Sequence, residues 1–264
     1  MSIYDVKGAV RRIEQRRESI PGLEYLLNHR LNHDAYDVEF SRTGEIVKVT
    51  RYLGSGGIHD TEQFLSDEAG THFRTLRFDG DGSLTRSTDL LHDSHSRCVG
   101  WVAHDKAGVV EGRGNDQYAE ELLVASESYT AAGIPVSQVS FEYAGNVLLK
   151  SLKKYYRPNG DLAEQWISRY DSEGRMEETF GLTANGRPLG NGKYKYEYDA
   201  DGRKTQVWSF NDLATDDVPN AVSVFEYVLD DVGNWVERRE HHRGRSSSRW
   251  GIRISRRRLA YWPV

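Results

Sequence analysis

Apolar and polar residues alternate along much of the chain, which is the pattern of β-strands. In residues 193–198 the order Lys-Tyr-Lys-Tyr-Glu-Tyr places aromatic rings on one face of a strand and charged groups on the other. Towards the end of the chain, Trp250, Ile252 and Ile254 alternate with arginine, glycine and serine. This predicts a last strand with a solvated basic face. We therefore expect a mainly β-structured chain.

A turn signal separates these segments, because an aromatic residue repeatedly stands four positions before a glycine. Nine Phe or Tyr residues have this spacing, whereas random placement of 23 Phe/Tyr and 25 Gly gives roughly two. The pattern is thus an internal repeat. Its clearest copies are Phe40–Gly44, Phe78–Gly82, Tyr129–Gly133, Tyr156–Gly160, Tyr170–Gly174 and Tyr198–Gly202, and His104–Gly108, Leu182–Gly186 and Leu229–Gly233 are degenerate copies.

The repeat has the chemistry of a β-hairpin loop. In residues 170–175, Tyr-Asp-Ser-Glu-Gly-Arg, the aspartate can accept backbone N–H groups at the first turn position. The glycine supplies the left-handed conformation that a three-residue hairpin loop needs at its last position. Residues 198–203 repeat the unit as Tyr-Asp-Ala-Asp-Gly-Arg. Such spacing predicts antiparallel strands of about eight residues joined in a meander.

The first 34 residues follow a different pattern, with apolar residues every three or four positions. This predicts a short helix and, after a Pro-Gly break, a second helical piece; the apolar positions are Val6, Val10, Ile13, Leu23, Leu26, Leu27 and Leu31. We predict an N-terminal helical segment over 1–34, then an antiparallel β-repeat domain over 35–264, a curved sheet of about a dozen strands. Residues 116–123 are a possible further helix, and residues 54–70 and 211–220 predict long loops.

The hairpin units resemble the YD repeats of the Rhs family, whose core is Tyr-Asp-x-x-Gly followed by Arg or Asn and a strand. Residues 170–175 and 198–203 match closely, and residues 229–235 match with leucine in place of the aromatic residue. The likeness is clearest over residues 141–240 and weaker over residues 40–133. Family members build large β-sheet shells around secreted bacterial toxins.

The resemblance implies a YD-repeat architecture and an association with polymorphic toxin systems. Two departures limit what it implies. The chain is far too short to close such a shell. It also lacks the Asp-Pro-x-Gly-Leu motif at which the large members resemble self-cleaving proteases, so release of a toxin tip is not implied. The repeat therefore predicts architecture and leaves function open.

Histidine and aspartate raise the hypothesis of a metal-dependent hydrolase. The ligand types are present in one region, at Asp89, His92, Asp93, His95, His104 and Asp105. Metal-dependent His-Asp phosphohydrolases place such residues on helices, whereas these stand near turns in strand-rich sequence. His29 and His33 have a metalloprotease spacing, but Arg30 stands where the glutamate is needed. We therefore interpret the histidines as turn or surface residues and expect no metal, no cofactor and no enzyme activity.

The aromatic rows are better candidates for a binding site. Tyr194 and Tyr196 share a strand face, and Trp166 and Trp208 lie on nearby predicted strands. One interpretation is that these rings form the core. The other is that they anchor a partner, because a single-layer sheet has two faces and too little sequence remains to cover both. We take Trp166, Tyr194, Tyr196 and Trp208 as candidate partner-binding residues.

Composition and charge favour a cytoplasmic protein. No stretch of about 18 apolar residues exists, and the first 17 residues lack the apolar core of a signal peptide. A single cysteine, Cys98, excludes an internal disulfide framework and is interpreted as a small buried hydrophobe. The net charge is −5, with a basic end from Arg238 onward and an acidic remainder.

The leading hypothesis is a protein-binding β-repeat protein, an immunity protein that neutralises a cognate secreted bacterial toxin or effector. A catalytic constellation is missing, a broad sheet offers a protein-binding surface, and the acidic body suits a cationic partner. One alternative is a carbohydrate- or cell-surface-binding structural protein, since aromatic rows also stack on sugars. A metal-dependent hydrolase is the second alternative. Neither nucleic acid nor membrane is expected as a partner.

Overall fold

The structure is a computed structural model that describes residues 10–19, 35–53, 55–67, 71–210, 218–244 and 250–261. Within these ranges the chain forms 18 β-strands and no helix. The strands are β1 (Val10–Ser19), β2 (Tyr36–Phe40), β3 (Ile46–Tyr52), β4 (Ile58–Ser66), β5 (His72–Asp79), β6 (Leu84–His92), β7 (Cys98–Asp105), β8 (Val110–Ala119), β9 (Leu122–Thr130), β10 (Pro135–Ala144), β11 (Val147–Tyr156), β12 (Leu162–Tyr170), β13 (Met176–Thr183), β14 (Pro188–Tyr198), β15 (Lys204–Phe210), β16 (Ala221–Leu229), β17 (Trp235–Gly244) and β18 (Gly251–Tyr261).

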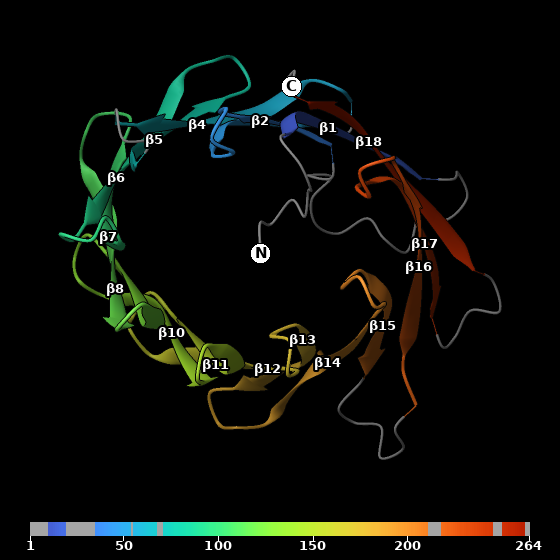
Figure 1. Cartoon of the computed structure of the whole chain (residues 1–264). Coiled ribbons are helices and arrows are strands. Elements are labelled where there is room, and N and C mark those ends of the chain that lie inside the picture. The colour runs from blue at the N-terminus through green and yellow to red at the C-terminus, as the bar shows by residue number, and fades with distance from the viewer. Residues whose placement is uncertain are drawn as a thin grey trace.

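The sheet is a closed antiparallel barrel. Each strand pairs with the next one in the sequence, and β1 pairs with both β2 and β18, so the strands form a ring (Figure 1). The prediction of an open curved sheet is therefore wrong. The internal repeat indicated the strands, but pairing between the first and last strands has no signal in the local sequence.

The predicted N-terminal helix is also wrong where the structure describes it, because residues 10–19 form β1. The ladder between β1 and β18 shifts register between Val10 and Arg12, which is a β-bulge. One extra residue there brings Val10 and Ile13, three positions apart, to the same face of the strand. The same spacing is typical of a helix, which explains the wrong prediction. The second predicted helical piece, residues 23–32, lies outside the described ranges.

The glycine turns are confirmed. All nine repeat glycines, in both the clear and the degenerate copies, have positive φ angles between 74° and 88°. In the 170–175 hairpin, the Asp171 N–H donates to the Arg175 carbonyl at 2.9 Å and the Gly174 N–H donates to the Asp171 carbonyl at 3.0 Å. This closes the three-residue loop that the sequence predicts.

The structure gives a physical reason for the Asp-x-x-Gly-Arg order. One carboxylate oxygen of Asp171 accepts the backbone N–H groups of Glu173 and Arg175, both at 2.9 Å. Its other oxygen accepts the Arg175 Nε–H at 2.7 Å. Burial opposes ionisation of Asp171, but these hydrogen bonds prevail and lower its pKa. Asp199 and Arg203 repeat the arrangement.

The tyrosine of the repeat fastens neighbouring hairpins together. The Tyr198 hydroxyl, at the end of β14, donates to the Met176 carbonyl at the start of β13 at 2.8 Å. The Arg175 guanidinium lies over the Tyr198 ring, 5.4 Å from its centroid. Tyrosines near the ends of β8, β10 and β16 make equivalent bonds to the preceding strand; they are Tyr118, Tyr143 and Tyr227. The Tyr-Asp-x-x-Gly-Arg unit is thus a cross-strand contact as well as a turn.

The sequence pattern failed to predict three features of the chain. Ser96 takes the glycine position with φ 61°, in a loop where Asp93 and Arg97 pair as in the YD units. Residues 116–123, a possible helix from the sequence, form the end of β8, a turn with Glu120 at φ 53° and the start of β9. The long loop predicted over residues 54–70 contains β4. The predicted loop over residues 211–220 lies outside the described ranges up to residue 217.

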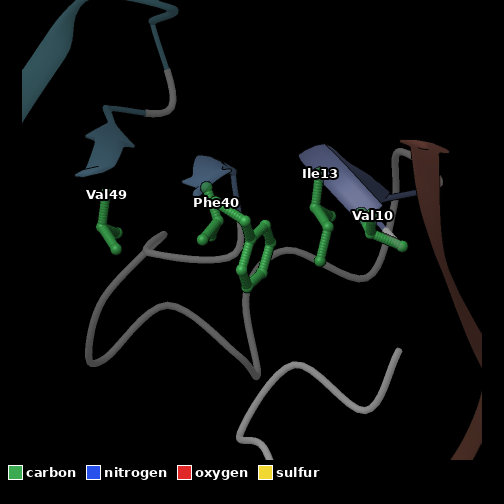
Figure 2. Packing of buried hydrophobic residues seen from close by; sticks show 5 residues of the cluster. Val10, Ile13, Phe40 and Val49 are labelled. Carbon is green, nitrogen blue, oxygen red and sulfur yellow. The ribbon is translucent and has the colours of Figure 1, made fainter. Parts of the chain in front are cut away.

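The apolar core is small and lies where the ring closes. It consists of buried residues of β1, β2 and β3: Val10, Ile13, Val38, Phe40 and Val49. Figure 2 shows that the labelled side chains project from their strands to one side, which is the inside of the ring in Figure 1. Residues paired across a ladder point to the same face of the sheet, and successive residues along a strand point to opposite faces. The position of this cluster therefore shows which residues of all the remaining strands face inwards. We call the two faces the inner wall and the outer wall.

Replacing Gly174 by valine is expected to lower the free energy of unfolding by about 1–3 kcal/mol, because a β-branched residue resists a positive φ. A Cβ at this position meets no atom within 4 Å, so the cost comes from the backbone alone. Gly174→Asn is the control, since asparagine tolerates the left-handed region. Urea unfolding measures both variants. Equal stability of Gly174→Val and Gly174→Asn would contradict the backbone explanation.

Candidate functional site

The four predicted partner-binding aromatic residues lie on two different walls. Trp166 pairs with Gly181 of β13, and Tyr194 pairs with Thr179 of the same strand, so Trp166, Tyr194 and Tyr196 share one wall. The register followed from the core cluster, strand by strand, shows that this is the inner wall. Trp208 alternates with its inner-wall neighbours on β15 and lies on the outer wall. The four residues therefore cannot form one continuous contact surface.

Trp166 is packed against the wall that carries it. A Cβ built on Gly181 would stand 3.0 Å from the Trp166 indole, so the ring lies flat against that glycine on the neighbouring strand. The indole N–H donates to Glu164 Oε1 at 3.1 Å. Trp101 lies on Gly114 in the same way, and its Nε1 fills the place that a side chain at Gly114 would need. Glycine beneath an aromatic ring thus recurs on the inner wall, and it restrains both tryptophans.

Tyr194 and Tyr196 belong to an inner-wall row on β14 that continues to Tyr198. Burial raises the pKa of Tyr196 to about 12, and the neighbouring tyrosines add to the shift. The Lys204 ammonium lies 4.5 Å from the centroid of the Tyr196 ring. Tyr196 is thus a neutral hydrogen-bonding group and a platform for a cation at neutral pH.

Trp208 lies in an outer-wall row of mixed character. It pairs with Lys195 of β14 and Val222 of β16, and its indole is half-buried. A neighbouring row runs across five strands through paired residues, namely Leu152, Ile167, Phe180, Lys193 and Phe210. Phe210 is buried, whereas the other apolar members of this row are half-buried.

Cations border these outer-wall rows. Arg169 and Lys193 share Glu178, at 3.3 Å and 3.4 Å. Lys195 makes no ion pair with any residue in the described ranges, and its ammonium lies 5.5 Å from the centroid of the Phe210 ring. The outer wall here is therefore locally basic, although the whole chain carries −5.

Sequence reasoning missed a second group of cations, which lies on the inner wall of β15 to β18. The Arg238 guanidinium lies 5.4 Å, and that of Arg257 3.5 Å, from the centroid of the Trp235 ring. Trp235 is itself buried and meets Tyr227 edge to face at 6.3 Å. The signal that could have found this group lies on one face of β18, where arginine and small residues occupy every second position. The last strand predicted there is present, and alternate arginines face the inside.

A buried carboxylate stands on the inner wall of β4. Asp60 is 3% exposed and accepts hydrogen bonds from Arg51 at 2.6 Å, Arg77 at 2.7 Å and His59 at 2.8 Å. Burial opposes its ionisation, but these three donors prevail and lower the pKa of Asp60 to about 2. Arg51 also bonds Glu62 at 2.9 Å. These hydrogen bonds join β3, β4 and β5 through Asp60.

The histidines suspected of binding a metal are not brought together. His92 pairs with Cys98 at one end of β7, whereas His104 lies six residues further along that strand. At about 3.3 Å per residue, this separates them by roughly 20 Å. In the ranges that the structure covers, no three His, Cys, Asp or Glu residues are grouped so as to hold a metal ion. His29 and His33 lie outside those ranges.

Two further features of the described residues are a cysteine and a surface depression. Cys98 is half-buried, and its thiol donates to the Gly100 carbonyl at 3.3 Å. A surface depression of about 310 Å³ lies on the outer wall of β3 to β5, lined in part by Lys48, Gln63 and Phe78. It is far along the sheet from Trp208. Across the described parts of the chain, no helix is long and apolar enough to cross a membrane.

One known structure shares the overall fold of this barrel. A porin-like protein from Bacteroides uniformis has a TM-score of 0.50 and 12% identity, and the match covers 95% of this chain and 98% of that one. A porin-like protein from Bacteroides vulgatus has a TM-score of 0.36 and 14% identity, over 98% of this chain and 100% of that one. At this identity the first likeness concerns the fold alone, and the lower TM-score of the second supports no conclusion.

The toxin assembly TcdB2-TccC3 is also similar in part. Its TM-score is 0.24 with 10% identity, over 89% of this chain. This chain spans 17% of that one. The likeness is too weak to support an argument about function. No protein-family model and no curated protein sequence matches the chain.

Proposed function

We propose that this barrel is a non-enzymatic, immunity-type protein that binds and neutralises a cognate bacterial toxin through its outer wall around Trp208. The observation that carries the proposal is the half-buried Trp208 beside the apolar row of β11 to β13, bordered by Arg169 and Lys195. An aromatic anchor within a charged surround is the usual anatomy of a protein-binding surface. The local positive charge suits an acidic surface on the toxin.

The proposal keeps one of the four predicted partner-binding residues, Trp208, and drops the other three. Trp166 is restrained against Gly181 on the inner wall, and Tyr194 and Tyr196 face the same way. A folded toxin that docks on the outside of the ring meets Trp208 and none of these three. The resemblance of the turn units to Rhs repeats supports a place among toxin systems.

We also propose that the barrel works in water, in the cytoplasm. Ion pairs join neighbouring strands on the outer wall in several parts of the ring, as in Arg12–Asp37 at 2.8 Å and Arg256–Glu237 at 2.8 Å. A basic residue on a lipid-facing wall costs about 2–4 kcal/mol at the bilayer midplane. Such pairs suit a wall that faces solvent. Recovery of the protein only in detergent-extracted membranes would contradict this localisation.

Replacing Trp208 by alanine is expected to weaken binding to a cognate toxin, sought first in the neighbouring gene, by at least about 2 kcal/mol, which is roughly 30-fold. Trp166→Ala is the matched control on the inner wall and should bind as the parent does. Calorimetry measures affinity, and circular dichroism checks that each variant is folded. Lys195→Glu is a second test, because it reverses a charge without emptying a packed site, and it should also weaken binding.

Two results would overturn the proposal. One is a parent protein that does not bind the neighbouring toxin at all. The other is unchanged affinity in both Trp208→Ala and Lys195→Glu, which would move the contact surface away from this part of the outer wall.

A further inference from the structure

Three cations stand on neighbouring strands of the inner wall, on the opposite face from Trp208. Arg238 of β17 pairs with Tyr227 of β16 and with Ser255 of β18. The Tyr227 hydroxyl donates to the Lys204 carbonyl of β15 at 2.8 Å, which places Lys204 beside this ladder. Arg257 lies two residues beyond Ser255 and faces the same way. We call Lys204, Arg238 and Arg257 the inner cation group.

The charges of Lys204 and Arg238 are not balanced by the acids described on this wall. The inner-wall Glu240 is occupied by Arg253 at 2.9 Å. Within the described ranges, no carboxylate forms an ion pair with Lys204 or Arg238, and the buried Nε–H of Arg238 has no acceptor. Burial lowers the pKa of Lys204, and the charge of Arg238 lowers it further. Neighbouring cations and a buried donor without an acceptor are costly unless an anion binds them.

Aromatic rings and neutral side chains hold the cations in place. Arg238 lies over the rings of Phe225 and Trp235, at 5.6 Å and 5.4 Å from their centroids. Arg257 donates to Gln15 Oε1 at 3.0 Å and to the Tyr36 hydroxyl at 3.1 Å. These contacts orient both guanidinium groups. The group is therefore a preorganised donor array rather than a set of mobile surface chains.

We infer that the inner cation group binds a phosphate-bearing small molecule inside the ring, with Lys204 and Arg238 as its principal contacts. Guanidinium groups match phosphate oxygens with two parallel donors, and lysine adds a point charge. The paired charges of Lys204 and Arg238 suit a diphosphate or polyphosphate better than a single carboxylate. Barrels of about 16–18 strands generally have an interior wider than one layer of side chains.

Inorganic pyrophosphate is the probe for this site, and isothermal titration calorimetry of the full chain is the measurement. The parent is expected to bind pyrophosphate with one site per chain. Lys204→Gln and Arg238→Gln should each weaken binding at least about tenfold, because each removes a charge-assisted contact. Lys106→Gln, which removes an exposed charge in the turn between β7 and β8, is the matched control and should bind as the parent does.

The outcomes separate clearly. No binding by the parent, or equal binding by parent and both variants, would overturn the inference. Citrate that binds as tightly as pyrophosphate would overturn the assignment to phosphate. If Arg238→Gln does not fold, Lys204→Gln alone decides the result, since its side chain lies at the start of a strand and its carbonyl bond to Tyr227 does not depend on the side chain. Toxin binding at Trp208 is independent of all these results.

Discussion

Ile13→Ala is expected to lower the free energy of unfolding by about 2–5 kcal/mol, the usual range for truncating a buried aliphatic side chain to alanine. Ile13 is fully buried, at 0% exposed, and packs within the small cluster where the ring closes. β1 pairs with β2 on one side and with β18 on the other, so weakening it weakens both ladders. The cavity left by alanine has little apolar material around it to refill the space.

Leu149→Ala is the control for this prediction. Leu149 is 43% exposed, so its truncation removes little buried area and should cost well under about 1 kcal/mol. Urea unfolding of the two variants, followed by tryptophan fluorescence, gives the comparison. If both variants lose equal stability, the cluster at the closure is not the core of the barrel.

Asp60→Asn is expected to cost about 3–5 kcal/mol, because it removes one partner of a buried charge cluster and leaves the others unpaired. Arg51 and Arg77 would then face a neutral amide in a site where Asp60 is 3% exposed. Arg51 keeps Glu62, so the loss should fall short of complete unfolding. Asp231→Asn, an exposed residue in the turn before β17, is the control and should be nearly neutral.

The same carboxylate predicts a dependence of stability on pH. The pKa of Asp60 is about 2 in the folded protein, below its ordinary value of 3.8. A lowered folded pKa means that the ionised group stabilises the fold above the unfolded pKa. This contribution, about 2 kcal/mol, is complete above roughly pH 5 and disappears as the pH falls towards 2. Urea unfolding at several pH values should show this loss in the parent and a smaller one in Asp60→Asn.

The turns were predictable from the sequence because their physics is local. A glycine with positive φ and an aspartate four residues before an arginine need only neighbours within one loop. Ser96 shows the limit, because a serine in the left-handed position carries no signal that separates it from any other serine. The strand pattern from residue 35 onward follows from the same local alternation.

The closure of the ring and the facing of the candidate residues were not predictable. β1 meets β18 through residues that no periodic pattern links, and the bulge at Val10 mimics a helical spacing. Tyr194 and Trp208 lie on different walls because of the register between β14 and β15, which sequence alternation alone leaves free. On a sheet with polar groups on both walls, hydrophobicity does not distinguish inside from outside. The inner cation group escaped notice for the same reason.

The contact between β1 and β18 constrains the order in which the molecule assembles. The bond from Arg257 to Gln15 spans 242 positions in the sequence. During synthesis, β1 is made first but its partner β18 comes last, so the growing sheet has two open edges until translation reaches the final strand. Unpaired edges recruit strands from other chains, and contacts between distant residues form slowly. A ring of local hairpins therefore depends on one late, long-range event, and production rate and chaperone supply should govern how much of it folds.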